Sequence, residues 1–284
     1  MGWISNDWLP WLDRAGRVSR LRAAVFALLW VPLALLAART LAGDLGPRPI
    51  TEAIHDSGDW TVRLLILTIV VTPLRQVSGR SELIGVRRMI GVATLVAALL
   101  HVTLYMADLG WDAGRIATEI LIRPYLAIGF VALAGLVALG VTSTDGAIRR
   151  LGGAAWKRLH GLVHPIVLLA LVHVFLQSKL DLAQGAILTG VACAGLAIRL
   201  AAERGSATSI VAAIVAAAVA SIGGGAMEAV WFTLKTGRSP TGLLASNFDA
   251  AYRIPPSWIA GAIAATALVV AHLVRRKMPA RRVR

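Results

Sequence analysis

The chain has 284 residues, of which 57% are hydrophobic and only 15% are charged, a composition that predicts an integral membrane protein and excludes an ordinary soluble domain. Its net charge of +14 comes from basic residues at the ends of apolar segments, so it indicates membrane topology and no nucleic-acid role. The single cysteine, Cys193, excludes internal disulfides and covalent c-type haem, so any haem is held non-covalently.

Long apolar runs rich in Leu, Ala and Val predict membrane-spanning helices, because lipid offers no partners to unpaired backbone groups. Residues 1–20 mix Trp and Leu with charged side chains and predict a short interfacial helix, with a poorly ordered tail as the alternative. Eight spans are then expected in chain order, at about residues 22–42, 60–72, 89–106, 125–141, 155–176, 183–202, 209–234 and 257–274.

Two prolines and two loops are expected to shape the first three spans and their boundaries. Pro32 is a candidate kink in the first span, and Pro73 is expected to end the second. A polar loop containing His55 is expected before the second span, and a basic loop follows it. With the amino terminus inside, 20 of the 29 Lys and Arg residues fall on the inner side and 9 on the outer side. This asymmetry predicts eight spans with both termini in the cytoplasm.

Four histidines lie within the apolar spans: His101 in the third, and His160, His164 and His173 in the fifth. An ionisable side chain at bilayer depth is costly and is therefore expected to be functional. Neutral imidazole is a good ligand for haem iron and brings no charge into lipid. The histidines therefore predict a membrane cytochrome.

The depths of the histidines can be estimated from the helical rise of about 1.5 Å per residue. His101 lies about 20 Å above Arg88, and His173 lies about 22 Å above Arg158, so the two histidines share one level in the outer half of the membrane. Two imidazoles at equal depth on neighbouring helices can hold a haem from opposite sides. The alternative is that each histidine hydrogen-bonds a neighbouring group in the bundle.

His160 lies near the predicted inner face and is a candidate ligand of a second haem, although the third span offers no histidine at that depth. His164, one turn further along, can support His160, face a propionate or replace it. Thirteen residues place His160 and His173 about 140° apart on an ideal helix. Pro165 gives a reason for distortion, and whether the distortion aligns the two histidines stays open.

Basic residues near the predicted inner face are candidates to contact haem propionates or the head group of a flavin or quinone. Simple topology signalling is the stronger single explanation for most of them. His55 and His272 are expected to be incidental. The five candidate arginines are Arg75, Arg80, Arg87, Arg88 and Arg158.

A series of short motifs within residues 20–202 reads TPLR at 72–75, GR at 79–80, RRMIG at 87–91, LLH at 99–101, RPYL at 123–126, TS at 142–143, LG at 151–152, W at 156 and LH at 159–160. In this order they resemble the MsrQ (YedZ) family, haem-binding membrane subunits of a periplasmic methionine sulfoxide reductase system within the ferric-reductase-like transmembrane superfamily. His101, His160 and His173 fall on the family's three histidine positions, whereas His164 stands where members usually have an aromatic residue.

The resemblance implies an all-α bacterial inner-membrane protein, with a six-helix ferric-reductase-like bundle at residues 21–206 that binds one or two b-type haems. It implies that electrons enter from a cytoplasmic flavin reductase, bound FMN or the quinol pool. They would leave to a periplasmic molybdopterin-containing catalytic subunit that reduces oxidised methionine. Family members commonly stop after the sixth span, so residues 207–284 are expected to form a two-helix extension whose Ala and Gly content allows close helix contact. The open roles for this extension are docking a partner, forming a homo-oligomer, binding lipid and simple peripheral packing.

Other functions fit the sequence less well. A self-contained ferric or superoxide-producing reductase needs a nucleotide-binding unit, and no GxGxxG motif follows a predicted strand. A transporter with structural histidines is expected to show internal repeats, and no convincing repeat is present. The sequence therefore predicts an electron-transfer subunit without its own substrate-reducing site, with a different periplasmic acceptor as the open alternative.

Overall fold

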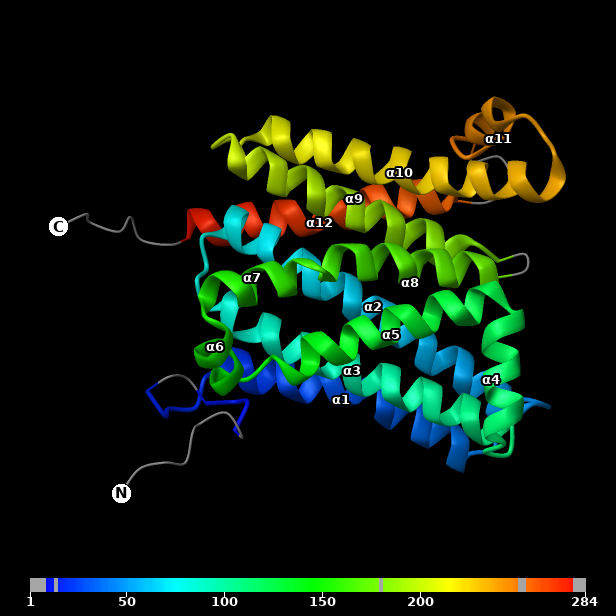
Figure 1. Ribbon diagram of the computed structural model, residues 1–284. Helices are drawn as coiled ribbons and strands as arrows, with labels where there is room; N and C mark the ends of the chain where they lie inside the picture. The colour runs from blue at the N-terminus through cyan, green and yellow to red at the C-terminus, as the bar shows by residue number, and fades with distance from the viewer. Residues whose placement is uncertain (1–8, 13–14, 179–180, 250–253, 278–284) are drawn as a thin grey trace, which may run out of the picture. The chain divides into compact units, whose positions relative to one another are not determined.

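A computed structural model describes residues 9–12, 15–178, 181–249 and 254–277, and within them the chain is helical without a β-strand (Figure 1). In this part of the chain, eight helical segments are long and apolar enough to cross a membrane. They are α1 (Arg20–Leu41), α2 (Pro49–Ser78), α3 (Leu83–Asp108), α5 (Pro124–Val141), α7 with α8 (Gly153–Gly161 and Val163–Gln177), α9 (Ala183–Glu203), α10 (Ile210–Thr236) and α12 (Pro256–Arg276). The chain is thus a multi-pass membrane protein, as predicted.

The predicted polar and basic loops around the second span are wrong in part. Helix α2 begins at Pro49, so His55 lies on a helix. Pro at the first position of a helix suits its fixed φ angle, and the acidic Glu52 in the first turn favours the helix dipole. The same helix continues past Pro73, which puts Arg75 in its last turn and shortens the basic loop.

The start of the chain also departs from its prediction. Residues 1–8, 13 and 14 lie outside the described part, and the other residues before α1 form turns and an isolated bridge between Leu12 and Val18. The expected interfacial helix is therefore absent from the described residues of this segment. Ser19 is the N-cap residue of helix α1, and its side-chain oxygen accepts a hydrogen bond from the backbone N–H of Arg22.

The predicted fifth span is interrupted at Leu162, which separates α7 from α8. Pro165 has no backbone N–H, so it cannot bond the carbonyl of Gly161 four residues earlier. The ring Nδ1 of His164 donates to that carbonyl instead, at 3.0 Å. His164 therefore satisfies a backbone group that the proline leaves open.

Three short helices were not predicted: α4 (Ala113–Ile122), α6 (Asp145–Leu151) and α11 (Pro240–Ser246). Side-chain caps start two of them, with Asp112 accepting from the N–H of Arg115 and Thr144 from that of Ala147. Such caps compensate for the missing backbone partners at a helix start.

The chain folds as two compact units. Unit 1 comprises the residues up to Thr68 together with Gly85–His173, and unit 2 comprises Ile69–Ile84 together with the residues from Val174 onward. In unit 2, α9, α10 and α12 pack closely through small residues, and Ala216, Ala220 and Ala260 are fully buried. The predicted division into a haem-binding domain at 21–206 and an extension at 207–284 stays a prediction.

Candidate functional site

His101 and His173 come together in unit 1, from α3 and α8. Their ring centroids lie 6.5 Å apart, and the two ring planes make an angle of 82°. The equal depth predicted for these two residues permits such an approach. Both residues are partly buried by the helices around them.

Backbone carbonyls fix the orientation of both rings. The Nδ1 atom of His101 lies 2.9 Å from the carbonyl oxygen of Ile54, and the Nδ1 atom of His173 lies 2.7 Å from that of Tyr125. A carbonyl oxygen only accepts, so each Nδ1 donates its hydrogen and each neutral ring keeps its lone pair on Nε2. Metal-bound histidines are held in the same way, by a hydrogen bond from the nitrogen opposite the metal.

Two glycines allow the helix backbone to approach these rings. A Cβ atom at Gly58 on α2 would lie 3.0 Å from His101 Cε1, and one at Gly129 on α5 would lie 2.8 Å from His173 Nδ1. Ser57, next to Gly58, places its hydroxyl 3.4 Å from His101 Nδ1 and donates to the Ile54 carbonyl at 2.9 Å. The backbones of α2 and α5 thus pack closely against the two rings.

The spacing of the two rings fits a shared metal. With metal–nitrogen bonds of about 2.0–2.1 Å, two imidazoles on opposite sides of one ion have ring centroids about 6.3 Å apart. The observed 6.5 Å agrees with this value. Two protein ligands leave four positions around a six-coordinate ion, and a porphyrin supplies four nitrogens. The residues present therefore fit a haem held between His101 and His173.

His160 has different surroundings. Its ring stacks on Trp156 with centroids 3.9 Å apart, and its Nε2 lies 3.2 Å from the hydroxyl of Thr142. That hydroxyl lies 2.7 Å from the carbonyl of Ala138, to which it donates its only hydrogen, so it accepts from His160 Nε2–H. The Thr142 carbonyl also accepts from Trp156 Nε1 at 2.9 Å. Thr142 and Trp156 thus hold His160, and its lone pair is on Nδ1.

Both histidines at the two ends of the α7–α8 segment lie against α5. His173 contacts the start of α5, at Tyr125, and His160 contacts its end, at Thr142. The interruption at Leu162 lies between the two histidines, so the offset of about 140° predicted for one ideal helix does not apply unchanged. The 17 residues between Tyr125 and Thr142 correspond to about 25 Å along the helix, close to the thickness of a bilayer core.

The candidate arginines are divided between the two units. Arg75 and Arg80 belong to unit 2, where Arg80 pairs with Glu82. Arg87 and Arg88 lie in unit 1, close enough to His160 for their charges to act on it. Arg88 also pairs with Asp145 at 2.7 Å and donates to the carbonyl of Ser143. Arg158 is exposed on α7.

The two histidines predicted to be incidental lie in different units. His55 is exposed on α2, one residue after Ile54. His272 on α12 of unit 2 places its ring nitrogens 2.8 Å and 2.9 Å from the carbonyls of Leu268 and Thr208, which joins the end of α12 to the turn before α10. Backbone contacts thus account for the position of His272.

Sequence reasoning missed the groups that hold the histidines. Thr142 and Trp156 stood in the motifs that carried the family resemblance, so a signal for them was present. Gly58 and Gly129 gave none, because a glycine in an apolar helix is common. The carbonyls of Ile54 and Tyr125 are invisible in any sequence, since every residue has one.

Comparisons with known proteins found a matching family and several similar proteins. The family described as "Ferric reductase like transmembrane component" matches residues 57–171. The "Protein-methionine-sulfoxide reductase heme-binding subunit MsrQ" of Rhodospirillum rubrum is 38% identical over 189 residues, which cover 66% of this chain and 88% of the relative. The proteins of the same name from Xanthomonas campestris strain B100 and Caulobacter vibrioides are 40% and 38% identical, with 60% and 59% of this chain and 81% and 83% of the relatives covered. No solved structure gives a significant match.

Proposed function

Because this chain belongs to the MsrQ family, the heme-binding subunits of protein-methionine-sulfoxide reductase, we propose that it carries electrons across the bacterial inner membrane to a periplasmic reductase. The observation that carries the proposal is the pair of His101 and His173, each with Nδ1–H on a backbone carbonyl and its Nε2 lone pair available. A transporter has no need of two such imidazoles at this separation.

The residues around the pair have separate tasks in this function. His101 and His173 would hold the haem iron through Nε2, and the carbonyls of Ile54 and Tyr125, which fix the rings, would raise the basicity of the ligand nitrogens. A bound b-type haem supplies one-electron chemistry between ferric and ferrous iron.

His160 is the proposed ligand of a second haem, at the opposite end of α5 from His173. The separation of about 25 Å along α5 supports stepwise transfer, since one site near each face shortens each step. In the described geometry Nε2 of His160 is engaged with Thr142, so ligation through that atom requires Thr142 to release it. His164 supports this site indirectly, through the carbonyl of Gly161.

The proposed donor and acceptor are those that the resemblance to the family implies. Electrons enter on the side of His160, where Arg87 and Arg158 provide positive charge for a haem propionate, FMN or a quinone head group. The donor is a cytoplasmic flavin reductase or the quinol pool. The acceptor is a periplasmic molybdopterin-containing subunit that reduces methionine sulfoxide in envelope proteins.

Haem content tests the ligands. We expect the purified protein to show a reducible b-type spectrum, and His101→Ala and His173→Ala each to lose the haem of this pair because five-coordinate binding by the remaining imidazole is weak. His160→Ala should lower the haem-to-protein ratio from two to one. His55→Ala, an exposed histidine one residue from Ile54, is the control and should keep both. Full haem content in both His101→Ala and His173→Ala would remove the cytochrome assignment.

The partner is tested separately, in cells. Deleting the gene should slow the reduction of methionine sulfoxide in periplasmic proteins, and the wild-type gene but not His173→Ala should restore the rate. Unchanged repair in the deletion strain would point to another periplasmic acceptor. That result would not affect the assignment of the haem ligands, because haem content and the b-type spectrum test that assignment separately.

A further inference from the structure

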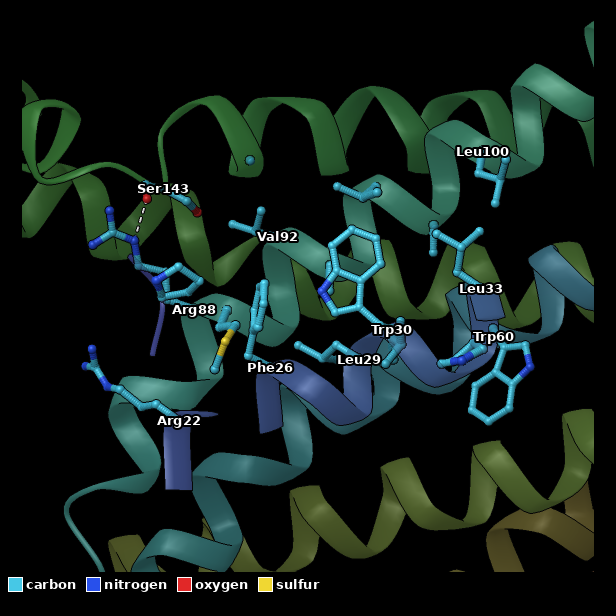
Figure 2. A pocket seen from close by; sticks show the side chains of 18 of the residues that line it. Arg22, Phe26, Leu29, Trp30, Leu33, Trp60, Arg88, Val92, Leu100 and Ser143 are labelled. Atoms are coloured by element: carbon cyan, nitrogen blue, oxygen red, sulfur yellow. Dashed lines mark hydrogen bonds between the residues drawn. The ribbon is translucent and has the colours of Figure 1, made fainter. Parts of the chain in front are cut away.

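An elongated pocket in unit 1 lies apart from the histidine pair. Its volume is about 590 Å³, and it is lined mainly by α1 and α3, with α2 on one side. Figure 2 shows Arg22 and Arg88 toward one end and Leu33, Trp60 and Leu100 toward the other. Neither His101 nor His173 lines it, so it is separate from the proposed haem site.

Helix α3 presents two different faces along its length. One face, with Val86, Ile90, Thr94 and Ala98, is buried in the protein. The other face turns to the pocket at three- and four-residue intervals, through Gly85, Arg88, Met89, Val92, Ala93, Val96, Ala97 and Leu100. Val92 and Val96 on this second face are 40% and 59% exposed, so the pocket opens sideways toward the surroundings of the helix.

Helix α1 supplies the opposite wall and is poorly covered by protein. None of its residues is buried, although Phe26, Leu29, Trp30 and Leu33 form an apolar stripe along the pocket. In a bilayer such a wall needs an apolar neighbour of its own length. An extended hydrocarbon chain meets this requirement, since the pocket runs along both helices from their starts.

The end of the pocket where α1 and α3 begin is polar. The Arg22 guanidinium lies against Gly85, where a Cβ atom would come within 2.8 Å of Arg22 Nε, and it donates to the carbonyl of Leu12. Arg88 donates to the carbonyl of Ser143 and pairs with Asp145. Among the described side chains named here, two guanidinium groups thus meet one carboxylate, which leaves one positive charge in excess.

We propose that this pocket binds one anionic phospholipid of the bilayer. Its phosphate lies between Arg22 and Arg88, and an acyl chain runs between α1 and α3 toward Trp60 and Leu100. The excess positive charge selects a phosphate ester over an uncharged isoprenoid quinone, which has the same kind of tail. The bound lipid completes the packing of α1 and joins it to the rest of unit 1.

The far end of the pocket reaches the neighbourhood of the histidine pair. Ser57 lines it, and the Ser57 hydroxyl lies 3.4 Å from His101 Nδ1. The lipid chain therefore contacts a residue that contacts a proposed haem ligand. Binding is nevertheless measurable without haem, because Arg22, Arg88 and the apolar lining belong to the protein alone.

Native mass spectrometry of the full-length protein tests the proposal. Protein stripped of lipid in detergent is titrated with phosphatidylglycerol, phosphatidylcholine or ubiquinone. We expect one phosphatidylglycerol per chain to bind at least tenfold more tightly than phosphatidylcholine, and to raise the melting temperature. Arg22→Gln should weaken this binding about tenfold, the effect of one charge-assisted hydrogen bond. Arg20→Gln is the matched control, since Arg20 is exposed near the same end and does not line the pocket.

A second pair of variants tests the apolar part. Ala97→Phe fills the pocket and should abolish the stoichiometric lipid, whereas Leu99→Phe, on an exposed position of the same helix outside the pocket, should not. Equal binding of phosphatidylcholine, equal effects of Arg22→Gln and Arg20→Gln, or displacement of phosphatidylglycerol by ubiquinone would each overturn the proposal. None of these outcomes bears on haem content, so they are distinguishable from a failure of the proposed function.

Discussion

The orientation of each paired histidine depends on two partners, a carbonyl that takes the Nδ1 hydrogen and a glycine that makes room for the ring. On α5 these partners are Tyr125 and Gly129, one helical turn apart. A helix presents residues four apart on the same face, so the carbonyl and the gap serve the same ring. The geometry of ligation is therefore a property of the α5 backbone as much as of His173.

Gly129→Ala should separate this positioning role from general packing. The added methyl group would lie within 2.8 Å of His173 Nδ1 and would force the ring away from the Tyr125 carbonyl, so we expect lower haem occupancy and an altered low-spin spectrum. Gly135→Ala is the control on the same helix, because its methyl group would meet Ile166 Cδ1 at 2.7 Å and crowd only an aliphatic side chain. Equal haem loss in the two variants would mean that α5 packing, and no specific ring contact, controls occupancy.

The same residue-scale contacts mark the limit of prediction from sequence. The histidines were predictable because imidazole in an apolar span is expensive and therefore rare. The carbonyl of Ile54 became a partner only because α2 extends back to Pro49, and the sequence had suggested a loop there. The role of Gly58 depended on the same extension. To predict a contact between elements distant in the sequence, the positions of both backbones must be known first.

At the scale of elements, the interruption between α7 and α8 matters most, because it lies between His160 and His173 and a break can change the angle between them. The proline that causes it was visible in the sequence, but its effect on the phase was not, since a break can turn a helix in several directions. His164 compensates for the proline at the Gly161 carbonyl. His164, which stands where the resemblance leads us to expect an aromatic residue, thus supplies the hydrogen bond that the backbone lacks at this break.

Pro165→Ala should restore the N–H that the Gly161 carbonyl lacks and favour one continuous helix. On such a helix His160 and His173 lie about 140° apart, so one of them leaves α5, and we expect the loss of one haem per chain. His164→Ala keeps the break but removes the hydrogen bond to Gly161, which should lower stability by about 1 kcal/mol and leave haem content unchanged. Haem titration and thermal unfolding distinguish the two, and two haems in Pro165→Ala would contradict the role assigned to the break.

Among the other elements, the long spans apart from α2 and the start of α3 were predictable within a few residues, and the short helices were not. A span follows from composition alone, because the bilayer demands about 20 apolar residues in hydrogen-bonded form. Helices such as α4 and α6 are shorter than this, lie in polar segments and depend on single capping residues such as Asp112 and Thr144. Local signals of that kind occur at many turns that do not become helices.

At the scale of the whole molecule, the proposed chemistry and the extension belong to different packing units. His101, His160 and His173, with the carbonyls that hold them, are all in unit 1, whereas α10 and α12 are in unit 2. The Rhodospirillum rubrum relative is matched over 88% of its length by 189 residues, so it is shorter than this chain. The boundary at residue 206 stays a prediction, because unit 2 also contains Ile69–Ile84 and α9, which the predicted haem-binding domain at residues 21–206 includes.

Ending the chain after residue 206 tests that boundary. The truncation removes α10 and α12, and α9 loses the close contacts that Gly190 makes with Ala220 and Ala260. The surface of α9 that becomes uncovered is apolar, including Ala194 and Ile198, and lipid covers such a surface almost as well as protein does. We therefore expect a lower melting temperature in membranes but an unchanged haem-to-protein ratio and reducible spectrum. Loss of the b-type spectrum from membranes that still contain the truncated chain would show that unit 2 helps to form the site, and would overturn the predicted boundary.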